Sequence, residues 1–380
     1  MVVTKKNKTL APKFNKSQAM KYVKALGDDA SIVADGTIYD ITSLIDTGSY
    51  LLNAQVSKSI YGGIASNRIM SLAGEESTGK TFLLLGIIKH YLEQNPDAMV
   101  VFFESEGAVN KETIESRGID SSRVILKSVI SVENFKKTCT KFIKDYTADP
   151  KDERIPMLMC LDSLGMLPSE KEVQDAQDGK DKSDMTRPKV IKSIFRILTV
   201  ALAKANIPLI VTNHVYATME MYGKPEMGGG SGLKYAGSLI LYLSKAQYKE
   251  KDENTKKEDH AGILVTSYTH KSRETREKKK VKFVIHADYG IDRFSGLFEF
   301  CVDTGLILKT GNRWYWASEG EETATYQKTI NRDPSSFFNK KRLDEIDIMC
   351  NKYFGYGKGE KSAFDTDTFH DDSEDDETED

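Results

Sequence analysis

The chain has 380 residues and a hydrophobic content of 39%, which suffices for one large α/β domain with smaller additions at its ends. It contains no apolar run of about eighteen residues, and its basic start lacks a following apolar segment, so we expect neither a membrane-spanning helix nor a secretory signal. The four cysteines are far apart and form no C-x-x-C pair, which predicts reduced thiols and a cytoplasmic protein.

Charge is distributed unevenly along the chain. The net charge is −3, but residues 365–380 contain ten Asp or Glu and no Lys or Arg, so residues 1–364 alone carry +7. A basic body with an acidic tail is frequent among nucleic-acid binders, although solvated surface charge gives the same pattern. The composition beyond residue 356 predicts a disordered acidic tail over residues 357–380.

The amino-terminal segment predicts an arm rather than part of a core. The arm is expected over residues 1–40. Its residues 1–30 are rich in lysine and contain one short helical pattern at residues 16–26, so the arm either docks on a neighbouring subunit or forms a loose terminus. The core is expected to span residues 41–318. A small C-terminal region with a last helix is expected over residues 319–356.

One motif organises the core. Residues 74–81 fit G-x-x-x-x-G-K-[ST] at every fixed position, between an apolar strand at 68–72 and a buried helix at 82–92. A chance glycine-rich turn is the alternative, but this context is the one a phosphate-binding loop requires. Lys80 would reach the β- and γ-phosphates of ATP, and the Thr81 hydroxyl would ligate Mg²⁺. The predicted nucleotide contacts are Gly74, Glu75, Glu76, Ser77, Thr78, Gly79, Lys80, Thr81 and Phe82.

Two later strands end in carboxylates. The apolar strand at residues 99–103 is followed by Glu104 and Glu106, and the one at residues 156–161 by Asp162. Ligands of α/β folds lie at the carboxyl ends of parallel strands. Glu106 is therefore the candidate for polarising the attacking water, with Glu104 as a helper; a surface carboxylate is the plain alternative. Asp162 is the candidate to hold Mg²⁺ beside Thr81.

Two connections follow that are candidates for binding a polymer. Residues 165–187 are charged and without apolar periodicity, which predicts a long loop that is functional or disordered. A helix at 189–206 and a strand at 207–214 come next, and the strand ends at His214, a γ-phosphate sensor or a buried structural histidine. Residues 215–232 form a glycine-rich loop, either a DNA-binding loop or a flexible linker. Its candidate DNA contacts are Tyr216, Met219, Met221, Tyr222, Lys224, Gly228, Gly229, Gly230, Ser231 and Gly232.

The last part of the core predicts further strands at residues 238–243, 262–268 and 281–286. The last two strands are joined by a basic connection at 270–280, which is a solvated hairpin tip or a source of cations for a neighbouring subunit's nucleotide. A helix at 296–304 follows, and residues 314–316 are expected to form either a short strand or a packed aromatic turn.

These stretches together resemble the RecA-type strand-exchange recombinases, and among them the UvsX-type recombinases of T-even bacteriophages, over roughly residues 40–318. The similar segments include the phosphate loop, the acidic pair Glu104 and Glu106, the Asp162-Ser163 end of the later strand, and residues 229–238 and 290–297. His214 stands where bacterial members have Gln. Thr113 stands where the family is expected to have an adenine-stacking Tyr.

The resemblance implies an α/β RecA-like P-loop ATPase core with a mostly parallel central sheet flanked by helices. It implies ATP and Mg²⁺ as cofactors and a helical filament of identical subunits on single-stranded DNA that pairs it with homologous duplex DNA and exchanges strands. A single-strand-binding protein and a recombination mediator would be further partners. Lys271 and Arg273 fall where the family places cations that reach the adjacent subunit's ATP, and Arg187 follows its first DNA loop. A ring-type RecA-core helicase and a non-catalytic recombinase paralogue are the alternatives.

Overall fold

The computed structural model describes residues 15–27, 30–180, 186–216, 226–228, 231–251 and 258–357. Its strands are β1 Leu44–Ile45, β2 Ile64–Ala65, β3 Ile69–Gly74, β4 Met99–Glu104, β5 Val124–Ser128, β6 Met157–Asp162, β7 Leu209–Tyr216, β8 Glu226–Met227, β9 Leu239–Lys251, β10 Glu258–Ser272, β11 Lys280–His286, β12 Gly290–Ile291, β13 Ile307–Thr310 and β14 Arg313–Trp316. Its α-helices are α1 Lys16–Leu26, α2 Tyr50–Ser57, α3 Lys80–Gln94, α4 Lys111–Glu115, α5 Val132–Ala148, α6 Glu170–Gln177, α7 Arg187–Ala205, α8 Ser231–Ala236, α9 Leu297–Asp303, α10 Gln327–Arg332, α11 Pro334–Phe337 and α12 Lys340–Phe354.

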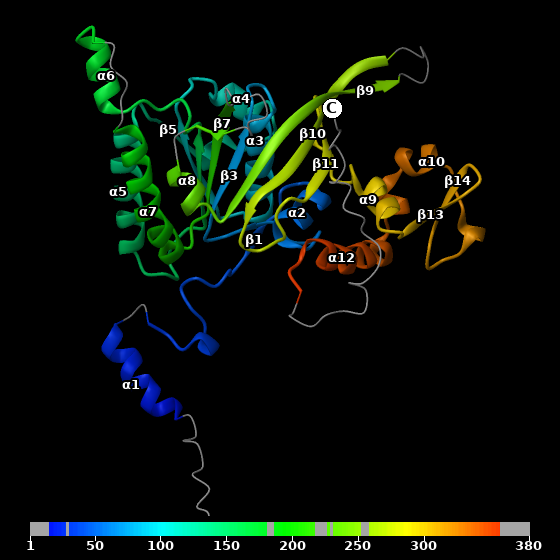
Figure 1. The fold of residues 1–380 in the computed structure, drawn as a ribbon, viewed down its shortest axis with the longest axis horizontal. Coiled ribbons are helices and arrows are strands. Elements are labelled where there is room, and N and C mark those ends of the chain that lie inside the picture. Colours follow the sequence, from blue (N-terminus) through cyan, green and yellow to red (C-terminus); the bar gives the residue numbers. More distant parts are fainter. Residues whose placement is uncertain are drawn as a thin grey trace, which may run out of the picture.

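A single large sheet forms the centre of the molecule, with the strand order β12-β11-β10-β9-β3-β7-β6-β4-β5 (Figure 1). The six strands from β9 to β5 in that order are parallel, whereas β10, β11 and β12 continue the sheet with antiparallel pairing. The short strand β8 pairs with the end of β7. The predicted α/β fold with a mostly parallel central sheet is confirmed.

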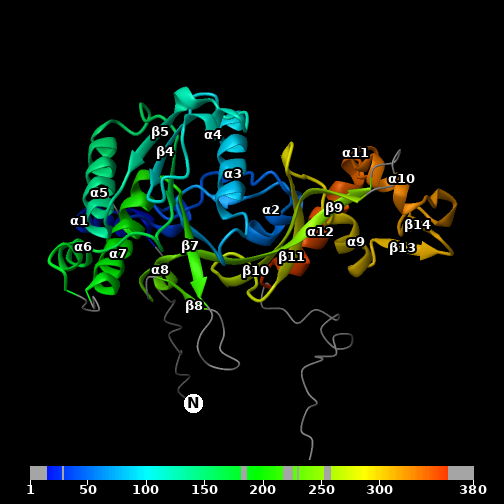
Figure 2. The same cartoon turned by 90° about the horizontal axis from the view of Figure 1, so that it is seen from above.

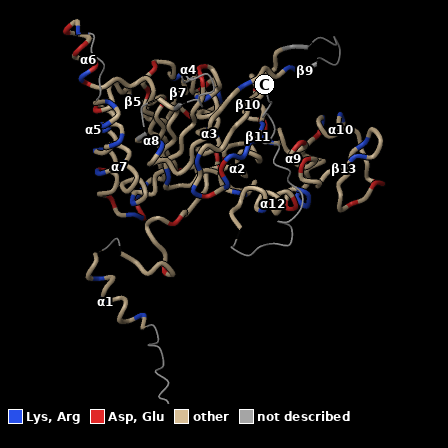
Figure 3. The backbone as a smooth tube through the Cα atoms, in the orientation of Figure 1, with Lys and Arg blue, Asp and Glu red and all other residues tan. Residues whose placement is uncertain are grey.

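Helices cover both faces of this sheet. In β4, Val100 and Phe102 pack into one core with α2, α3, α9 and α12, while Val101 and Phe103 pack into a second core with α5, α7 and α8. A strand whose alternate residues are buried on both sides reads as a continuous apolar run, as the sequence of β4 does. Figure 2 shows α5 and α7 on one side of the central strands and α3 on the other. These strands carry almost no charged residues, which gather on the helices and connections (Figure 3).

The predicted long loop at residues 165–187 is corrected, because part of it is the helix α6. The Ser169 side chain accepts a hydrogen bond from the backbone N–H of Glu172, and Glu170 and Glu172 occupy the first turn. A good N-cap and acidic residues near the helix N-terminus stabilise a short helix without an apolar face. None of the residues of α6 is buried, so apolar periodicity could not reveal it.

The lengths of β9 and β10 are also corrected. They were predicted to cover residues 238–243 and 262–268, but they pair with each other as far as Lys251 and Glu258, and β10 runs on to Ser272. Cross-strand hydrogen bonds stabilise this hairpin beyond the point where apolar side chains stop, which is why alternation in the sequence understates its length. The predicted basic connection therefore begins inside β10.

The amino-terminal helix predicted at residues 16–26 is confirmed as α1. Its first turn is capped by the Asn15 side chain, none of its residues is buried, and it stands apart from the body (Figure 1). Within the small C-terminal region, Arg342 forms an ion pair with Glu319. The Trp316 indole at the end of the core donates to Glu345 of this region at 2.7 Å. In the part of the chain that the structure describes, no helix is long and apolar enough to cross a bilayer. The predicted acidic tail lies almost wholly beyond the described residues.

The core predicts a clear contrast between two strand substitutions. Phe102 is fully buried in β4, so Phe102→Ala should lower the free energy of unfolding by about 3–5 kcal/mol. Ile125 on the edge strand β5 is 44% exposed, and Ile125→Ala should cost clearly less. Urea unfolding followed by circular dichroism measures both. Equal losses for the two variants would contradict the placement of β4 at the centre.

Candidate active site

The register of the parallel strands places the predicted polar residues in one row. Gly74 at the end of β3 is paired with His214 of β7, and Glu104 at the end of β4 is paired with Asp162 at the end of β6. Leu161 is paired with Val211, so Asp162 lies beside Thr212. The carboxyl ends of β3, β7, β6 and β4 therefore meet at a single edge of the sheet, where ligands of such folds bind.

The phosphate loop connects β3 to α3, and glycines allow its tight backbone conformation. Gly79 is the residue before α3 and has φ of +84°, and a Cβ there would lie 2.6 Å from the Ile263 side chain. A Cβ on Gly74 would lie 2.7 Å from the Leu243 carbonyl oxygen. Both glycines are therefore needed for the turn and for the close packing of the loop against β9 and β10.

Lys80 is positioned inside this loop. Its ammonium donates to the carbonyl oxygens of Gly74 at 3.0 Å and Glu75 at 2.7 Å. Only 7% of the surface of Lys80 is exposed. Burial lowers the pKa of Lys80, while the carboxylates of Asp162, Glu106 and Glu76 act in the opposite direction. A buried ammonium surrounded by loop carbonyls and a turn of backbone N–H groups fits a polyphosphate.

Asp162 is held from two sides. The Thr81 hydroxyl donates to its Oδ2 at 2.7 Å, and the Thr212 hydroxyl donates to its Oδ1. Burial raises the pKa of Asp162, the two hydroxyls lower it, and Glu106 and Glu104 raise it further. A carboxylate and a hydroxyl next to a phosphate loop are hard oxygen ligands that suit Mg²⁺, so these residues fit the predicted metal.

Glu106 and His214, the candidate water-activating group and the candidate γ-phosphate sensor, lie next to each other. The His214 Nε2 lies 3.3 Å from the Glu106 Oε1, and the Ser163 hydroxyl donates to the same oxygen. Ser163 follows Asp162 through a cis peptide bond and is fully buried. Its neighbour in space, Ser105, donates to the carbonyl oxygens of Asp162 at 3.1 Å and Ser163 at 2.8 Å.

The Glu104 carboxylate is bonded to backbone N–H groups of the loop that follows it, which a second catalytic acid would not be. The carboxylate accepts the backbone N–H groups of Glu106, Gly107 and Ala108 at 3.1, 2.7 and 3.0 Å. Three such bonds hold the carboxylate within the loop that carries Glu106. The structure therefore places Glu104 as a residue that shapes this loop rather than one that faces the phosphate site.

The two candidate DNA loops begin next to His214. A Cβ on Gly165, at the start of the first loop, would lie 2.9 Å from the His214 ring. Gly228, near the end of the second loop, donates its N–H to the His214 carbonyl at 2.9 Å and accepts from the Asn213 side chain at 2.8 Å. The exposed Tyr216 ring packs beside Gly228. Both loops are thus anchored on the end of β7.

Arg187 is occupied within the protein. Its guanidinium donates to the carbonyl oxygens of Leu167 at 2.7 Å, Leu164 at 3.1 Å and Gly165 at 3.0 Å. It therefore joins the two ends of the first loop, instead of presenting a free cation to DNA as predicted. Gly232 packs closely on the backbone of α7, where a Cβ would lie 2.7 Å from the Lys192 Cα, and this close approach positions α8 after the second loop.

Several predicted DNA contacts lie outside the described residues, namely Met219, Met221, Tyr222, Lys224, Gly229 and Gly230. Ser231 is described only as the first residue of α8. For these residues the sequence-based interpretation stays a prediction.

Lys271 and Arg273 are far from the phosphate loop of their own subunit. Lys271 is paired with Ile240 of β9, which in turn is paired with Ser71 of β3. Ser71 precedes Gly74 by three residues, and a strand rises about 3.3 Å per residue, so Lys271 is displaced from the phosphate loop along the strands. The Lys271 ammonium donates to the carbonyl oxygens of Lys234 at 2.8 Å and Tyr235 at 3.0 Å, at the end of α8. The exposed Arg273 continues away from the loop, and its backbone N–H bonds to Ser238. Neither side chain reaches the nucleotide site in cis.

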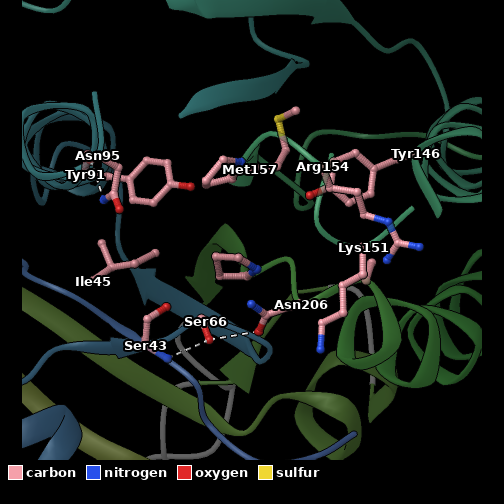
Figure 4. A pocket seen from close by; sticks show the side chains of 13 residues that line it. Ser43, Ile45, Ser66, Tyr91, Asn95, Tyr146, Lys151, Arg154, Met157 and Asn206 are labelled. Atoms are coloured by element: carbon pink, nitrogen blue, oxygen red, sulfur yellow. Dashed lines mark hydrogen bonds between the residues drawn. The ribbon is translucent and has the colours of Figure 1, made fainter. Parts of the chain in front are cut away.

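A separate cavity of about 160 Å³ opens at the opposite edge of the sheet (Figure 4). It is lined by residues at the beginnings of strands, such as Met157 of β6 and Pro208 before β7, together with Ser43, Tyr91, Arg154 and Asn206. Since the phosphate loop follows the other end of β3, this cavity is not the nucleotide site.

Sequence reasoning missed the positioning residues Ser163, Ser105, Thr212 and Asn213. The signal for the last two was present, since β7 reads Leu-Ile-Val-Thr-Asn-His and both polar side chains are fully buried. Polar side chains in a buried strand need hydrogen-bond partners, which indicates a role for each hydroxyl or amide.

The chain is similar in sequence to known proteins. The family described as RecA N-terminal domain matches residues 15–292. "Recombination and repair protein" of Enterobacteria phage T4 is 35% identical over 265 residues, which cover 70% of this chain and 65% of that protein. "Protein RecA" of Chloroherpeton thalassium is 25% identical over 339 residues, covering 87% and 85% of the two chains. "Protein RecA" of Leptospira meyeri is 26% identical over 276 residues, covering 72% and 66%. The match thus spans slightly less than two thirds of the phage protein.

The geometry at Glu106 predicts the outcome of a charge-removing substitution. Glu106→Gln keeps the shape of the side chain but removes the base, so the ATPase rate should fall by at least about 10²-fold while nucleotide binding is retained. Steady-state phosphate release and binding of a fluorescent ATP analogue measure the two properties. Glu112→Gln, on the exposed first turn of α4, is the matched control. Equal hydrolysis by the two variants would remove Glu106 from the role of base.

Proposed function

Because the chain belongs to the RecA N-terminal domain family, we propose that it is an ATP-dependent recombination protein that polymerises on single-stranded DNA and exchanges strands with homologous duplex DNA. The observation that carries the proposal is the joint anchoring of the phosphate site and both candidate DNA loops on the end of β7. His214 contacts the base Glu106 on one side, and its backbone holds Gly228 of the second loop on the other.

ATP would be held by the phosphate loop and Lys80, and Thr81 and Asp162 are the residues that would hold Mg²⁺. The metal would neutralise charge on the phosphates when bound. Glu106 would orient and deprotonate the attacking water, and the Glu104 carboxylate would keep the loop of Glu106 in place. Lys80 would leave the carbonyl oxygens of Gly74 and Glu75, to which it now donates, and turn to the phosphates.

The γ-phosphate would be sensed through His214. A phosphate oxygen near Glu106 competes for the hydrogen bond between His214 and Glu106, so the histidine responds to the state of the nucleotide. The response reaches the second loop through the bond from Gly228 to the His214 carbonyl, and the first loop through the contact with Gly165. Binding of DNA would be mainly to its backbone and steeply dependent on salt.

A neighbouring subunit would complete the site. Lys271 and Arg273 lie at the edge of the sheet opposite the phosphate loop, where a second subunit can approach them. Cations supplied in trans to a transferring phosphoryl group are worth roughly 10³–10⁵ in rate. Lys271 would exchange the two α8 carbonyl oxygens for the neighbour's phosphates. Exposed apolar residues on α1 and on β5 are further candidates for the contact between subunits.

A ring-type helicase and a non-catalytic paralogue remain the competing functions. The complete set of Lys80, Thr81, Glu106 and Asp162 at one edge favours an active ATPase over a paralogue. Unwinding of a forked duplex, in the absence of strand exchange, would support the helicase instead.

The primary test is homologous pairing. Purified protein with ATP and Mg²⁺ should pair a labelled single strand with homologous duplex DNA, and Lys80→Ala should abolish pairing because the phosphates lose their cation. Lys89→Ala, on the exposed side of the same helix α3, should behave as the wild type and serves as the control. Gel separation of joint molecules measures the product. Absence of pairing by the wild-type protein would overturn the proposed function.

The interface predicts complementation between two inactive variants. Lys271→Ala lacks the cation given to the neighbour but keeps its own phosphate site, whereas Glu106→Gln has the opposite defect. In a mixture, a Lys271→Ala site facing a Glu106→Gln neighbour is intact, so roughly a quarter of the interfaces should recover at equal concentrations. DNA-stimulated phosphate release should therefore reappear on mixing. A mixture as inactive as its components would show that Lys271 does not act in trans.

A further inference from the structure

We infer that Thr212 is the positioning residue for the metal-binding carboxylate of Asp162, an assignment that rests on the proposed Mg²⁺-ATP site. The Thr212 side chain is fully buried, and its hydroxyl donates to Asp162 Oδ1. The only other acceptor near this hydroxyl among the described residues is the Leu161 carbonyl at 3.4 Å, which is the weaker partner. A hydroxyl has one proton, so it is committed to the carboxylate.

The two bonds to Asp162 have different fates when a metal binds. Thr81 holds Oδ2 at 2.7 Å, but its hydroxyl is the group that would turn to the metal. The bond from Thr212 to Oδ1 uses the oxygen on the other side and is compatible with a metal near Oδ2. Thr212 would then be the residue that fixes the rotation of the carboxylate and aims Oδ2 at the metal. Such outer partners orient the ligands of metal sites.

The strand that carries Thr212 adds a second argument. Ile210 of β7 packs into the core on the α3 side, and with a side-chain period of two Thr212 and His214 face the same side. Thr212 therefore bonds the acid that would serve the metal, and His214 contacts the acid that would serve the water. One face of β7 thus sets the positions of both carboxylates relative to each other, while Asn213 on the opposite face bonds Gly228 of the second loop.

This role differs from packing alone. Removing the hydroxyl leaves Asp162 Oδ1 as a buried acceptor without its partner, which frees the carboxylate to rotate. The loss should appear as weaker binding of Mg²⁺ in the presence of nucleotide. Nucleotide affinity measured without Mg²⁺ should remain unchanged, because Thr212 makes its hydrogen bond to Asp162 and not to the phosphate loop or Lys80.

The test uses the full chain with three substitutions. Thr212→Val removes the hydroxyl with little change of shape, and Thr212→Ser keeps it. Thr269→Val is the matched control, because Thr269 is a fully buried strand residue whose hydroxyl has no hydrogen-bond partner within the described residues. Folding of each variant is checked by circular dichroism. Binding of a fluorescent ATP analogue is titrated with Mg²⁺, and binding of Mn²⁺ with a slowly hydrolysed ATP analogue is followed by electron paramagnetic resonance.

Thr212→Val should raise the Mg²⁺ midpoint by on the order of 10-fold and weaken Mn²⁺ binding to match, since loss of an outer partner costs about 10–100-fold in metal affinity. Thr212→Ser and Thr269→Val should stay close to the wild type. If Thr212→Val has the same midpoint as Thr269→Val, the positioning role is wrong while the proposed function stands. If the wild-type protein binds no nucleotide with Mg²⁺, the proposed function itself fails.

Discussion

The structure depends most on the register between β3, β7, β6 and β4. A parallel sheet brings the carboxyl ends of its strands to one edge, but register decides which residues stand side by side there. Pairing of Gly74 with His214 and of Glu104 with Asp162 brings the phosphate loop, the sensor and the acids into one row. A slip of one residue would turn each of these side chains to the other face of the sheet. Both faces of the central strands are packed against helices, so a slip would also exchange the side chains that fill the two cores for ones of different shape.

The same row of residues explains how the state of the nucleotide can affect the second loop. β7 lies between β3 and β6 in the sheet, and its two faces have different contacts. One face presents Thr212 and His214 to carboxylates, and the other presents Asn213 to the second loop. A change in the contact between Glu106 and His214 therefore acts on a residue whose own backbone holds Gly228. Coupling needs no long pathway here, since the two sites share adjacent residues of one strand.

Much of this site was predictable from the sequence, because strand ends are readable. Continuous apolar runs that stop at Glu104, Asp162 and His214 predict buried parallel strands, and the sheet then gathers their ends. The sequence did not predict in which direction a side chain points once the strand has ended. The Glu104 carboxylate folds back onto three backbone N–H groups, and the Arg187 guanidinium turns inward to three carbonyl oxygens. Those choices follow from local loop geometry, which leaves no periodic mark in the sequence. The helix α6 escaped for a related reason, since its capping signal is strong but it buries no residue.

The positions of the two groups of cations also constrain any assembly. Lys80 belongs to the carboxyl edge of the sheet, whereas Lys271 and Arg273 belong to the opposite part, level with Ser71 and earlier residues. On the proposed assignment, a subunit receives cations at one edge and gives them at the other. Such a contact joins unlike surfaces, so a two-fold dimer cannot satisfy it and each added subunit offers a new free edge. The result is a head-to-tail polymer that closes into a ring only if the rotation per subunit allows. If Lys271 completes the neighbouring site as proposed, an isolated subunit would have little ATPase activity, and DNA would activate it as the surface on which subunits align.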